Sequence, residues 1–354
     1  MSGLDQPIVI ANSNYHVGQE RSFRVAEEQG FLREEGLDRY VYERGGLIPG
    51  RWEFEALGQV MWERGVDIAT AVDVRAAVLQ RARGEDVYIV GGWRVQLAPR
   101  LIGAKGITGP EQLRGARIGV REKWGLNHIG LASAISTFGI DPEREIEWVE
   151  DPIVGYGSAG VEELLRSGRV TVLPLNGREA DRLMDEGYPL VLDLETFYRG
   201  RGAWPPGKVI VATRRTVEQR GAELRAFLRA NLRAFWFVQD PANHEYMFEL
   251  ETRMRASTFN DDERKLRMLR SESEVPVQTY DGPRSTGYMP MDGLVPRPAL
   301  AAIVQGMAQK GEIDSAFAVD DVLKDQASID AYDRLVSRGL IDAALVARWR
   351  GGAV

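Results

Sequence analysis

Short apolar, β-branched runs alternate with amphipathic stretches along most of the chain, and this pattern predicts strands and helices in turn. The first run is residues 7–12 (PIVIAN), followed by a polar loop and a helix that ends near Gly30. Further strands are predicted at 38–45, 66–72 and 87–90, and helices at 52–64 and 73–83. Because strands and helices alternate with short connections, the pattern favours a mainly parallel, doubly wound sheet.

A second array of the same kind follows residues 101–110, which carry little helical signal. The stretch EQLRGARIGV predicts a short helix that leads into a strand at 116–120. After it, helices are predicted at 126–138, 158–165 and 179–186, and strands at 145–149, 169–175 and 189–194. The chain is therefore expected to form two α/β lobes.

The last third of the chain is mainly helical. A strong strand pattern returns at 208–212 (KVIVA), and helices are predicted at 217–238, 241–255, 260–270, 298–310 and 328–349. The stretch 275–298 is rich in Pro and Gly but also carries Tyr280 and Tyr288, so we interpret it as an ordered loop. The sequence does not decide whether this loop covers a ligand or contacts another subunit.

Composition narrows the class of protein. With 354 residues, 44% of them apolar and 27% charged, the chain fits two soluble domains. The balance of 45 Lys+Arg against 52 Asp+Glu gives a net charge of −7 with no dense basic stretch, so we expect no nucleic-acid partner. Cysteine is absent, which excludes disulfides, thiolate metal sites and cysteine nucleophiles. The apolar runs are shorter than the roughly 18–20 residues of a membrane span, so we expect no membrane insertion.

The first residues, MSGLDQPIVIANSNYH, lack a charged segment followed by an apolar core. Two localisations stay open on this evidence. The protein is periplasmic if a leader has been removed, and cytoplasmic if Met1 is the native start.

Several phrases of the sequence resemble one family when taken in order. AEEQGFLREEGLD is similar to the family's helix and turn, GVDIATA to its third strand, and TGPEQLRGARIGV to the start of its second lobe. LLRSGRVTVLPL, GYMPMDGL and IVQGMAQKGEID also fit. The family is the type II periplasmic-binding-protein family, in its nitrate, taurine and alkanesulfonate class of ABC-transporter solute-binding proteins. The chain departs from it at Thr171 and Val172, where the family has Asp-Ala.

The resemblance implies a two-lobe α/β fold with two doubly wound sheets joined by a two-strand hinge. Lobe one would comprise residues 1–97 and 206–354, and lobe two residues 98–205. Closure of such lobes traps a small-molecule ligand in the cleft between them. An ABC permease would be the protein partner.

Ligands of open α/β sheets bind at the carboxyl ends of strands, where helix starts favour anions. Five segments of the chain fit this position, each with a structural alternative. The first is 12–16, where Ser13 suits a helix cap while Asn12, Asn14, Tyr15 and His16 are candidate contacts. In the second, 69–73, the candidates are Thr70 and Asp73, although strand-end packing explains the small residues equally well.

The remaining three segments add aromatic and cationic candidates. In 91–94 these are Gly92, Trp93 and Arg94, with a hinge anchor as the alternative. In 121–128 we expect Lys123 and Asn127 to bind an anion, Trp124 to stack and His128 to add an imidazole; a solvated Lys and a core Trp are the alternative. Tyr156, between two glycines, and Asn176 complete the set of candidate ligand contacts, although flexible turns look the same.

Signals for metal, cofactor or nucleotide chemistry are missing from the sequence. The chain has three histidines, of which His244 reads as structural, and no HxxxH spacing, so we expect no metal. No GxGxxG follows the first strand, and neither GxxxxGK[ST] nor GxSxG occurs, so we expect no cofactor.

Two functions stay open. The leading one is the solute-binding component of an ABC importer for a sulfonate, carboxylate, aromatic acid or nitrogen heterocycle. The alternative is an enzyme on the same fold, since the family's relatives include an aromatic sulfinate desulfinase and dihydroxyphthalate decarboxylases. Ser13-Asn14-Tyr15 resembles the desulfinase loop Ser-Asn-Cys with Tyr15 in place of the nucleophile. A lyase or decarboxylase here would instead use His16, His128 or Lys123.

Overall fold

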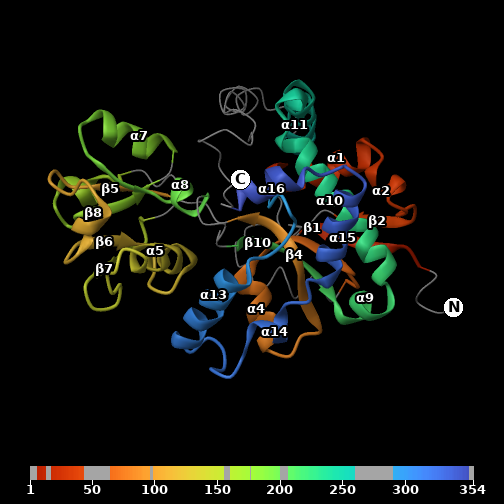
Figure 1. Ribbon diagram of the computed structural model, residues 1–354, viewed down its shortest axis with the longest axis horizontal. Coiled ribbons are helices and arrows are strands. Elements are labelled where there is room, and N and C mark those ends of the chain that lie inside the picture. Colours follow the sequence, from red (N-terminus) through yellow and green to blue (C-terminus); the bar gives the residue numbers. More distant parts are fainter. Residues whose placement is uncertain are drawn as a thin grey trace. The chain divides into compact units, whose positions relative to one another are not determined.

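The computed structural model describes residues 6–12, 17–43, 64–95, 99–154, 160–175, 177–199, 206–259 and 290–350 (Figure 1). The chain divides into two compact units. Unit 1 comprises the described parts of 1–95, 206–297 and 316–346, and unit 2 those of 96–205, 298–315 and 347–354. Residues 298–315 thus fall in unit 2, whereas we expected all of 206–354 in the first lobe.

Unit 1 is built on a five-stranded sheet of order β2-β1-β3-β10-β4. Its strands are β1 (Ile8–Asn12), β2 (Tyr40–Glu43), β3 (Ile68–Asp73), β4 (Val87–Val95) and β10 (Pro206–Thr213). β1 pairs in parallel with β2 and β3, and β10 runs antiparallel to β3 and β4. Ile8, Ile10 and Ile68 are fully buried, as the apolar runs predicted.

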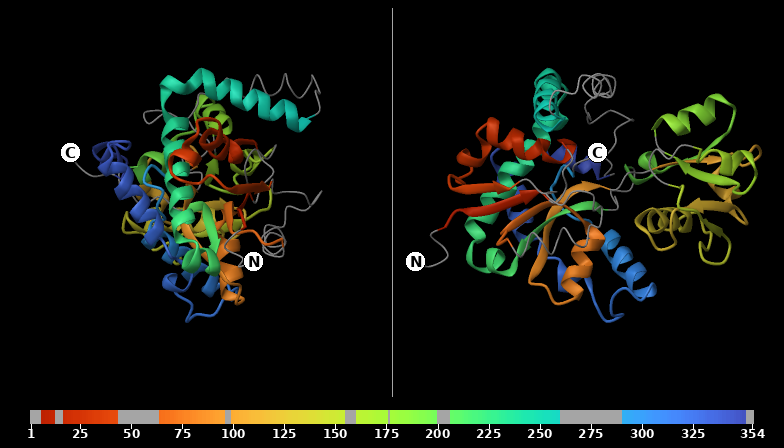
Figure 2. Two further views of the ribbon diagram at one scale, coloured as in Figure 1. Left: turned by 90° about the vertical axis from the view of Figure 1, so that its right-hand side faces the viewer. Right: turned by 180° about the vertical axis from the view of Figure 1, so that it is seen from behind.

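Helices cover both faces of this sheet, with α4 on one face and α1 and α10 on the other (Figures 1 and 2). The helices of unit 1 are α1 (Val17–Glu28), α2 (Phe31–Glu34), α4 (Val74–Ala82), α9 (Arg214–Gln219), α10 (Gly221–Gln239), α11 (His244–Phe259), α14 (Val319–Val322) and α15 (Gln326–Ser337). A 3-10 turn at Pro241–Asn243 joins α10 to α11, and α16 (Ala343–Trp349), which is divided between the two units after residue 346, follows α15. α10 packs against α1 and α15 and buries Phe227 and Phe235 in the core.

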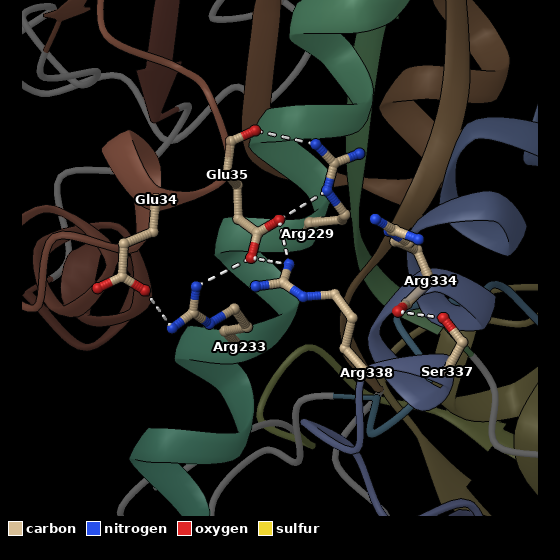
Figure 3. Close-up of polar contacts among 7 residues, drawn as sticks. All are labelled: Glu34, Glu35, Arg229, Arg233, Arg334, Ser337 and Arg338. Atoms are coloured by element: carbon tan, nitrogen blue, oxygen red, sulfur yellow. Dashed lines mark hydrogen bonds and ion pairs between the residues drawn. The ribbon is translucent and has the colours of Figure 1, made fainter.

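A charge cluster joins three of these helices (Figure 3). Glu35, directly after α2, has a buried carboxylate that accepts hydrogen bonds from Arg229 at 2.8 Å, Arg233 at 2.9 Å and Arg338 at 2.7 Å. Arg233 also reaches the exposed Glu34 at 2.7 Å. Because Arg229 and Arg233 lie on α10 and Arg338 follows α15, this Glu35 cluster ties α2, α10 and α15 together.

Unit 2 carries a second five-stranded sheet, of order β7-β6-β8-β5-β9. Its strands are β5 (Arg100–Gly103), β6 (Arg117–Val120), β7 (Glu147–Glu150), β8 (Val172–Leu175) and β9 (Leu190–Asp193). β6 is parallel to β7 and β8, and β5 is antiparallel to β8 and β9. Ile102, Leu173 and Leu183 lie in its core.

The helices of unit 2 are α5 (Leu126–Ser136), α6 (Glu163–Arg166), α7 (Gly177–Asp185) and α8 (Leu194–Arg199), with a 3-10 turn at Pro110–Leu113. α13 (Arg297–Gln309) approaches α5 closely at Gly306, where an added Cβ would lie 2.7 Å from the Ile129 side chain. Lys310, just beyond α13, pairs with Glu122 at 3.1 Å. These contacts explain why 298–315 belongs to unit 2.

The predicted α/β architecture is confirmed, with differences of detail. Both sheets are mixed, whereas we predicted mainly parallel ones, and β5 falls in a segment for which we predicted no element. The predicted helix 217–238 is divided at Arg220 into α9 and α10, and 328–349 is divided near Gly339, whose φ is 68°. Residues 52–63 of the predicted helix 52–64 and all of the predicted helix 260–270 lie outside the described residues.

Among the described residues, no helix combines the length and the apolarity needed to cross a membrane.

Candidate functional site

In unit 1, polar residues gather at the edge of the sheet where β1 and β3 end. Asn12 is opposite Thr70 in the register, and Asp73 is opposite Lys208 at the start of β10. Because β10 is antiparallel to β3, its first residues lie beside the last residues of β3. The sheet therefore brings together the predicted contacts Asn12, Thr70 and Asp73, and adds Lys208.

These four side chains are largely satisfied by the protein itself. Asn12 and Thr70 are fully buried, and the Thr70 hydroxyl donates to the Ala11 carbonyl at 3.4 Å. The Asp73 carboxylate accepts the backbone N–H of Arg75 at 3.0 Å and caps α4. The Lys208 ammonium lies 3.8 Å from the same carboxylate. Asp73 thus has a structural role as a helix cap, and its role as a ligand contact stays a prediction.

Ala71, within this edge, has a left-handed backbone. Its φ is 56° although it is fully buried in β3 between Thr70 and Val72. This conformation costs a non-glycine residue about 1–2 kcal/mol, so the surrounding structure holds it in place.

Gly92 and Trp93 lie in β4 and serve packing within unit 1. The Gly92 N–H donates to the Gly293 carbonyl at 2.8 Å, and a Cβ on Gly92 would lie 2.6 Å from the Leu294 carbonyl oxygen. Trp93 is 1% exposed and packs edge-on against Phe235. The glycine therefore admits the 290–294 segment, and the indole belongs to the core.

The other candidates of unit 1 and two of unit 2 cannot be placed. Asn14, Tyr15, His16, Tyr156 and Asn176 lie outside the described residues, as does the side chain of Arg94.

In unit 2, the loop between β6 and α5 carries Lys123 and Trp124. Trp124 has a left-handed backbone with φ 65°, and Gly125 precedes α5 without a side-chain cap. A bulky residue in this region of φ is an outlier that the neighbouring structure must enforce. The Lys123 backbone N–H donates to the Glu150 carboxylate, and its ammonium lies 5.3 Å from the centre of the Trp124 ring. Asn127 is half-buried in the first turn of α5.

His128 is enclosed between two indoles and has no hydrogen-bond partner. Its side chain is 0% exposed, and its ring centre lies 5.1 Å from that of Trp124 and 4.4 Å from that of Trp148. Neither ring nitrogen has a partner, although buried polar atoms usually find one. Burial lowers the pKa of His128 to about 4, so the imidazole is neutral near neutral pH.

Glu143 lies between the two basic side chains of this site. One carboxylate oxygen is 2.9 Å from the Lys123 ammonium and the other is 4.0 Å from Nε2 of His128. Trp148 is fixed by a hydrogen bond from its indole N–H to the Pro142 carbonyl at 2.7 Å. We call Lys123, Trp124, His128, Glu143 and Trp148 the α5 cluster.

Sequence reasoning missed Lys208, Glu143 and Trp148. Trp148 joins the site through the parallel pairing of β6 with β7, which places it opposite Ile118, and through its ring contact with His128; no local pattern marks it. No local signal in the sequence links Glu143 to Lys123. Within the described stretches of chain, no three His, Asp or Glu side chains are arranged to hold a metal ion.

No protein-family model matches the chain, and no curated protein matches its sequence. Solved structures do match. The periplasmic sulfonate-binding protein SsuA from Methylobacillus flagellatus KT is 15% identical, with 94% of this chain and 95% of that chain covered and a TM-score of 0.62. The aliphatic sulphonate-binding protein SsuA from Escherichia coli is 12% identical, with 90% and 91% covered and a TM-score of 0.53.

The periplasmic nitrate-binding protein NrtA from Synechocystis PCC 6803 is 11% identical, with 96% of this chain and 91% of that chain covered and a TM-score of 0.52. Identities this low establish the fold and nothing finer. The chain has the two-lobe α/β fold of the type II periplasmic-binding proteins, as the resemblance of its sequence predicted.

Proposed function

We propose that the protein binds a small organic acid as the solute-binding component of an ABC importer. One observation carries the proposal. Among the described residues, the left-handed non-glycine positions are Ala71 and Trp124, one in each unit. Each lies in a segment that the sequence predicted to contact a ligand. Backbone strain of this kind clusters at ligand sites, where the surrounding structure maintains it.

The chemistry of the α5 cluster favours a ligand with an acid group. The Lys123 ammonium and the start of α5 both attract negative charge, and Trp124 offers a half-buried indole beside them. A sulfonate or carboxylate attached to an aromatic or aliphatic body would satisfy both features.

The fold supports a transport role by analogy, because the similar structures are named as sulfonate- and nitrate-binding proteins of the periplasm. On this proposal the protein acts in the periplasm and delivers its ligand to an ABC permease.

A thermal-shift screen tests the proposal. The probes are methanesulfonate, benzenesulfonate, benzoate and a pyrimidine, and each compound that raises the melting temperature is recovered after incubation and quantified. A stabilising compound that is recovered unchanged supports binding. Consumption of the compound would instead establish the enzyme alternative, and no stabilisation by any acid would contradict the proposal.

Trp124→Ala sharpens this test. Loss of an aromatic contact of roughly 1–2 kcal/mol should weaken the affinity for the stabilising acid by about 5- to 30-fold, measured by calorimetry. Phe248→Ala is the control, since Phe248 is an exposed aromatic residue on α11 of unit 1. Equal affinities for wild type and Trp124→Ala would show that the α5 cluster does not contact the ligand.

A further inference from the structure

Glu143 has two basic partners within reach and is bonded to one of them. Its carboxylate is 2.9 Å from the Lys123 ammonium, a charge-assisted hydrogen bond, and 4.0 Å from Nε2 of His128, which is too far for one. Side chains of Lys123 and Glu143 are both more than a third exposed, so this ion pair can break and re-form at little cost. A movement of about 1 Å would bring Glu143 to hydrogen-bond distance of His128.

Both ring nitrogens of the buried His128 side chain lack a hydrogen-bond partner. Three charged groups act on its imidazole: Lys123 from the loop before α5, Glu143 from the turn before β7, and Glu150 from β7. The rings of Trp124 and Trp148 pack edge-on against the imidazole without supplying a hydrogen bond. With two carboxylates and one ammonium, the surroundings of the ring carry an excess negative charge, which a protonated imidazole would neutralise.

Charge balance shows what an incoming acid group would do. In the structure, Glu143 neutralises Lys123 while His128 is uncharged. An anion that binds Lys123 displaces Glu143, which is then left without a partner. If His128 takes one proton from solvent, the imidazolium pairs with Glu143 and the ligand pairs with Lys123, so each of these four groups has a partner of opposite charge.

We propose that Glu143 exchanges between Lys123 and His128, so that binding of the ligand's acid group is coupled to uptake of one proton. This inference rests on the proposed function and adds a regulation to it. Affinity for the acid then rises as pH falls, because protons and ligand favour the same arrangement. The affinity increases by close to tenfold for each pH unit of decrease in the range where His128 is unprotonated in the free protein and protonated in the complex.

The first experiment needs no ligand. With three histidines in the chain, side-chain NMR of histidine-labelled protein is simple to assign, and His128→Phe identifies the His128 signal. Lys123→Met removes a cation and releases Glu143, so it should raise the pKa of His128, and Glu143→Gln should lower it. Lys310→Met is the matched control, because Lys310 pairs with Glu122 in the same unit and should leave the titration unchanged. If neither Lys123→Met nor Glu143→Gln moves the titration, the exchange is wrong whatever ligand the protein binds.

The second experiment measures proton uptake directly. Binding of benzenesulfonate is followed by calorimetry at pH 5.5 in two buffers with different ionisation enthalpies. The expected result is uptake of close to one proton by wild type and none by His128→Phe. Binding of benzenesulfonate without proton uptake would overturn the coupling and leave the proposed function standing. Failure of benzenesulfonate to bind would overturn the coupling for sulfonates together with that ligand class.

Discussion

Unit 1 and unit 2 each bury an ionisable side chain, and they treat it in opposite ways. Glu35 of unit 1, with its side chain 2% exposed, receives hydrogen bonds from three arginines on two helical segments (Figure 3). His128 of unit 2, with its side chain 0% exposed, receives none. Glu35 and His128 are therefore buried to a similar depth, but the carboxylate is fully hydrogen-bonded and the imidazole has no hydrogen bond.

The effects on protonation follow from this difference. Burial by itself would raise the pKa of Glu35, but the hydrogen bonds from Arg229, Arg338 and Arg233 lower it below its ordinary value. Burial lowers the pKa of His128 to about 4, with no hydrogen bond to oppose it. Glu35 is thus charged and has a structural role, whereas His128 is neutral and its two ring nitrogens form no hydrogen bonds. An unsatisfied buried group of this kind marks a candidate functional site.

The largest expected effect comes from breaking the satisfied cluster. Glu35→Gln removes the charge that three arginines surround, and loss of one partner of a buried ion network costs about 3–5 kcal/mol. We expect this loss in the free energy of unfolding of unit 1. It is measured as a lower midpoint of urea unfolding, followed by a spectroscopic signal that reports on α10. Ligand affinity at the α5 cluster should stay unchanged.

Glu34→Gln is the matched control for this prediction. Glu34 pairs with Arg233 at 2.7 Å, but its side chain is 55% exposed, so its removal should cost less than about 1 kcal/mol. Similar losses in the two variants would mean that the Glu35 cluster is a surface network and that the contrast with His128 is false.

The next effect concerns the unsatisfied histidine and appears only in acid. The unfolded chain takes up a proton near pH 6.5 and the folded chain near pH 4, so His128 lowers stability as pH falls through this window and has no effect above it. The shift corresponds to roughly 3 kcal/mol at about 1.4 kcal/mol per pH unit. His128→Phe should therefore retain more of its neutral-pH stability at pH 4 than wild type does, in urea unfolding followed across this range. Equal pH dependence in the two proteins would show that His128 has the same pKa in the folded chain as in the unfolded one.

Much of the fold was predictable because its signals are local. The run 7–12 and the segment 66–72 became β1 and β3, since buried strands of a mainly parallel region carry continuous apolar residues. β5 was missed because only Leu101 and Ile102 of its four residues are buried hydrophobic side chains, too few to establish a period. The antiparallel directions of β5 and β10 were missed because no residue pattern encodes the direction of a strand.

The residues of the candidate site likewise separate into those marked by a local pattern and those brought in by tertiary contacts. Lys123, Trp124 and His128 stand within one loop and helix start, so the sequence could single them out together. Glu143 and Trp148 join them only through the pairing of β6 with β7, which is a tertiary fact. Gly92 shows that a glycine can answer a tertiary need that the local sequence does not reveal, because it admits residues 290–294 from a distant part of the chain.

The smallest expected effect tests whether the strain at Ala71 is real. Ala69 and Ala71 are both fully buried in β3, but only Ala71 has a left-handed backbone, with φ 56°. Changing either to glycine removes one buried methyl group and costs about 0.5–1 kcal/mol in backbone entropy, whereas only Ala71→Gly also relieves about 1–2 kcal/mol of strain. Ala71→Gly should therefore unfold at a higher urea concentration than Ala69→Gly. The difference in the free energy of unfolding should be roughly 1 kcal/mol or more. If the two variants are equally destabilised, Ala71 carries no strain, and the argument that left-handed residues mark a ligand edge in both units fails. If Ala71→Gly is the more stable and also binds the stabilising acid more weakly, Ala71 lowers the stability of unit 1 in favour of ligand binding, as we propose for His128 in unit 2.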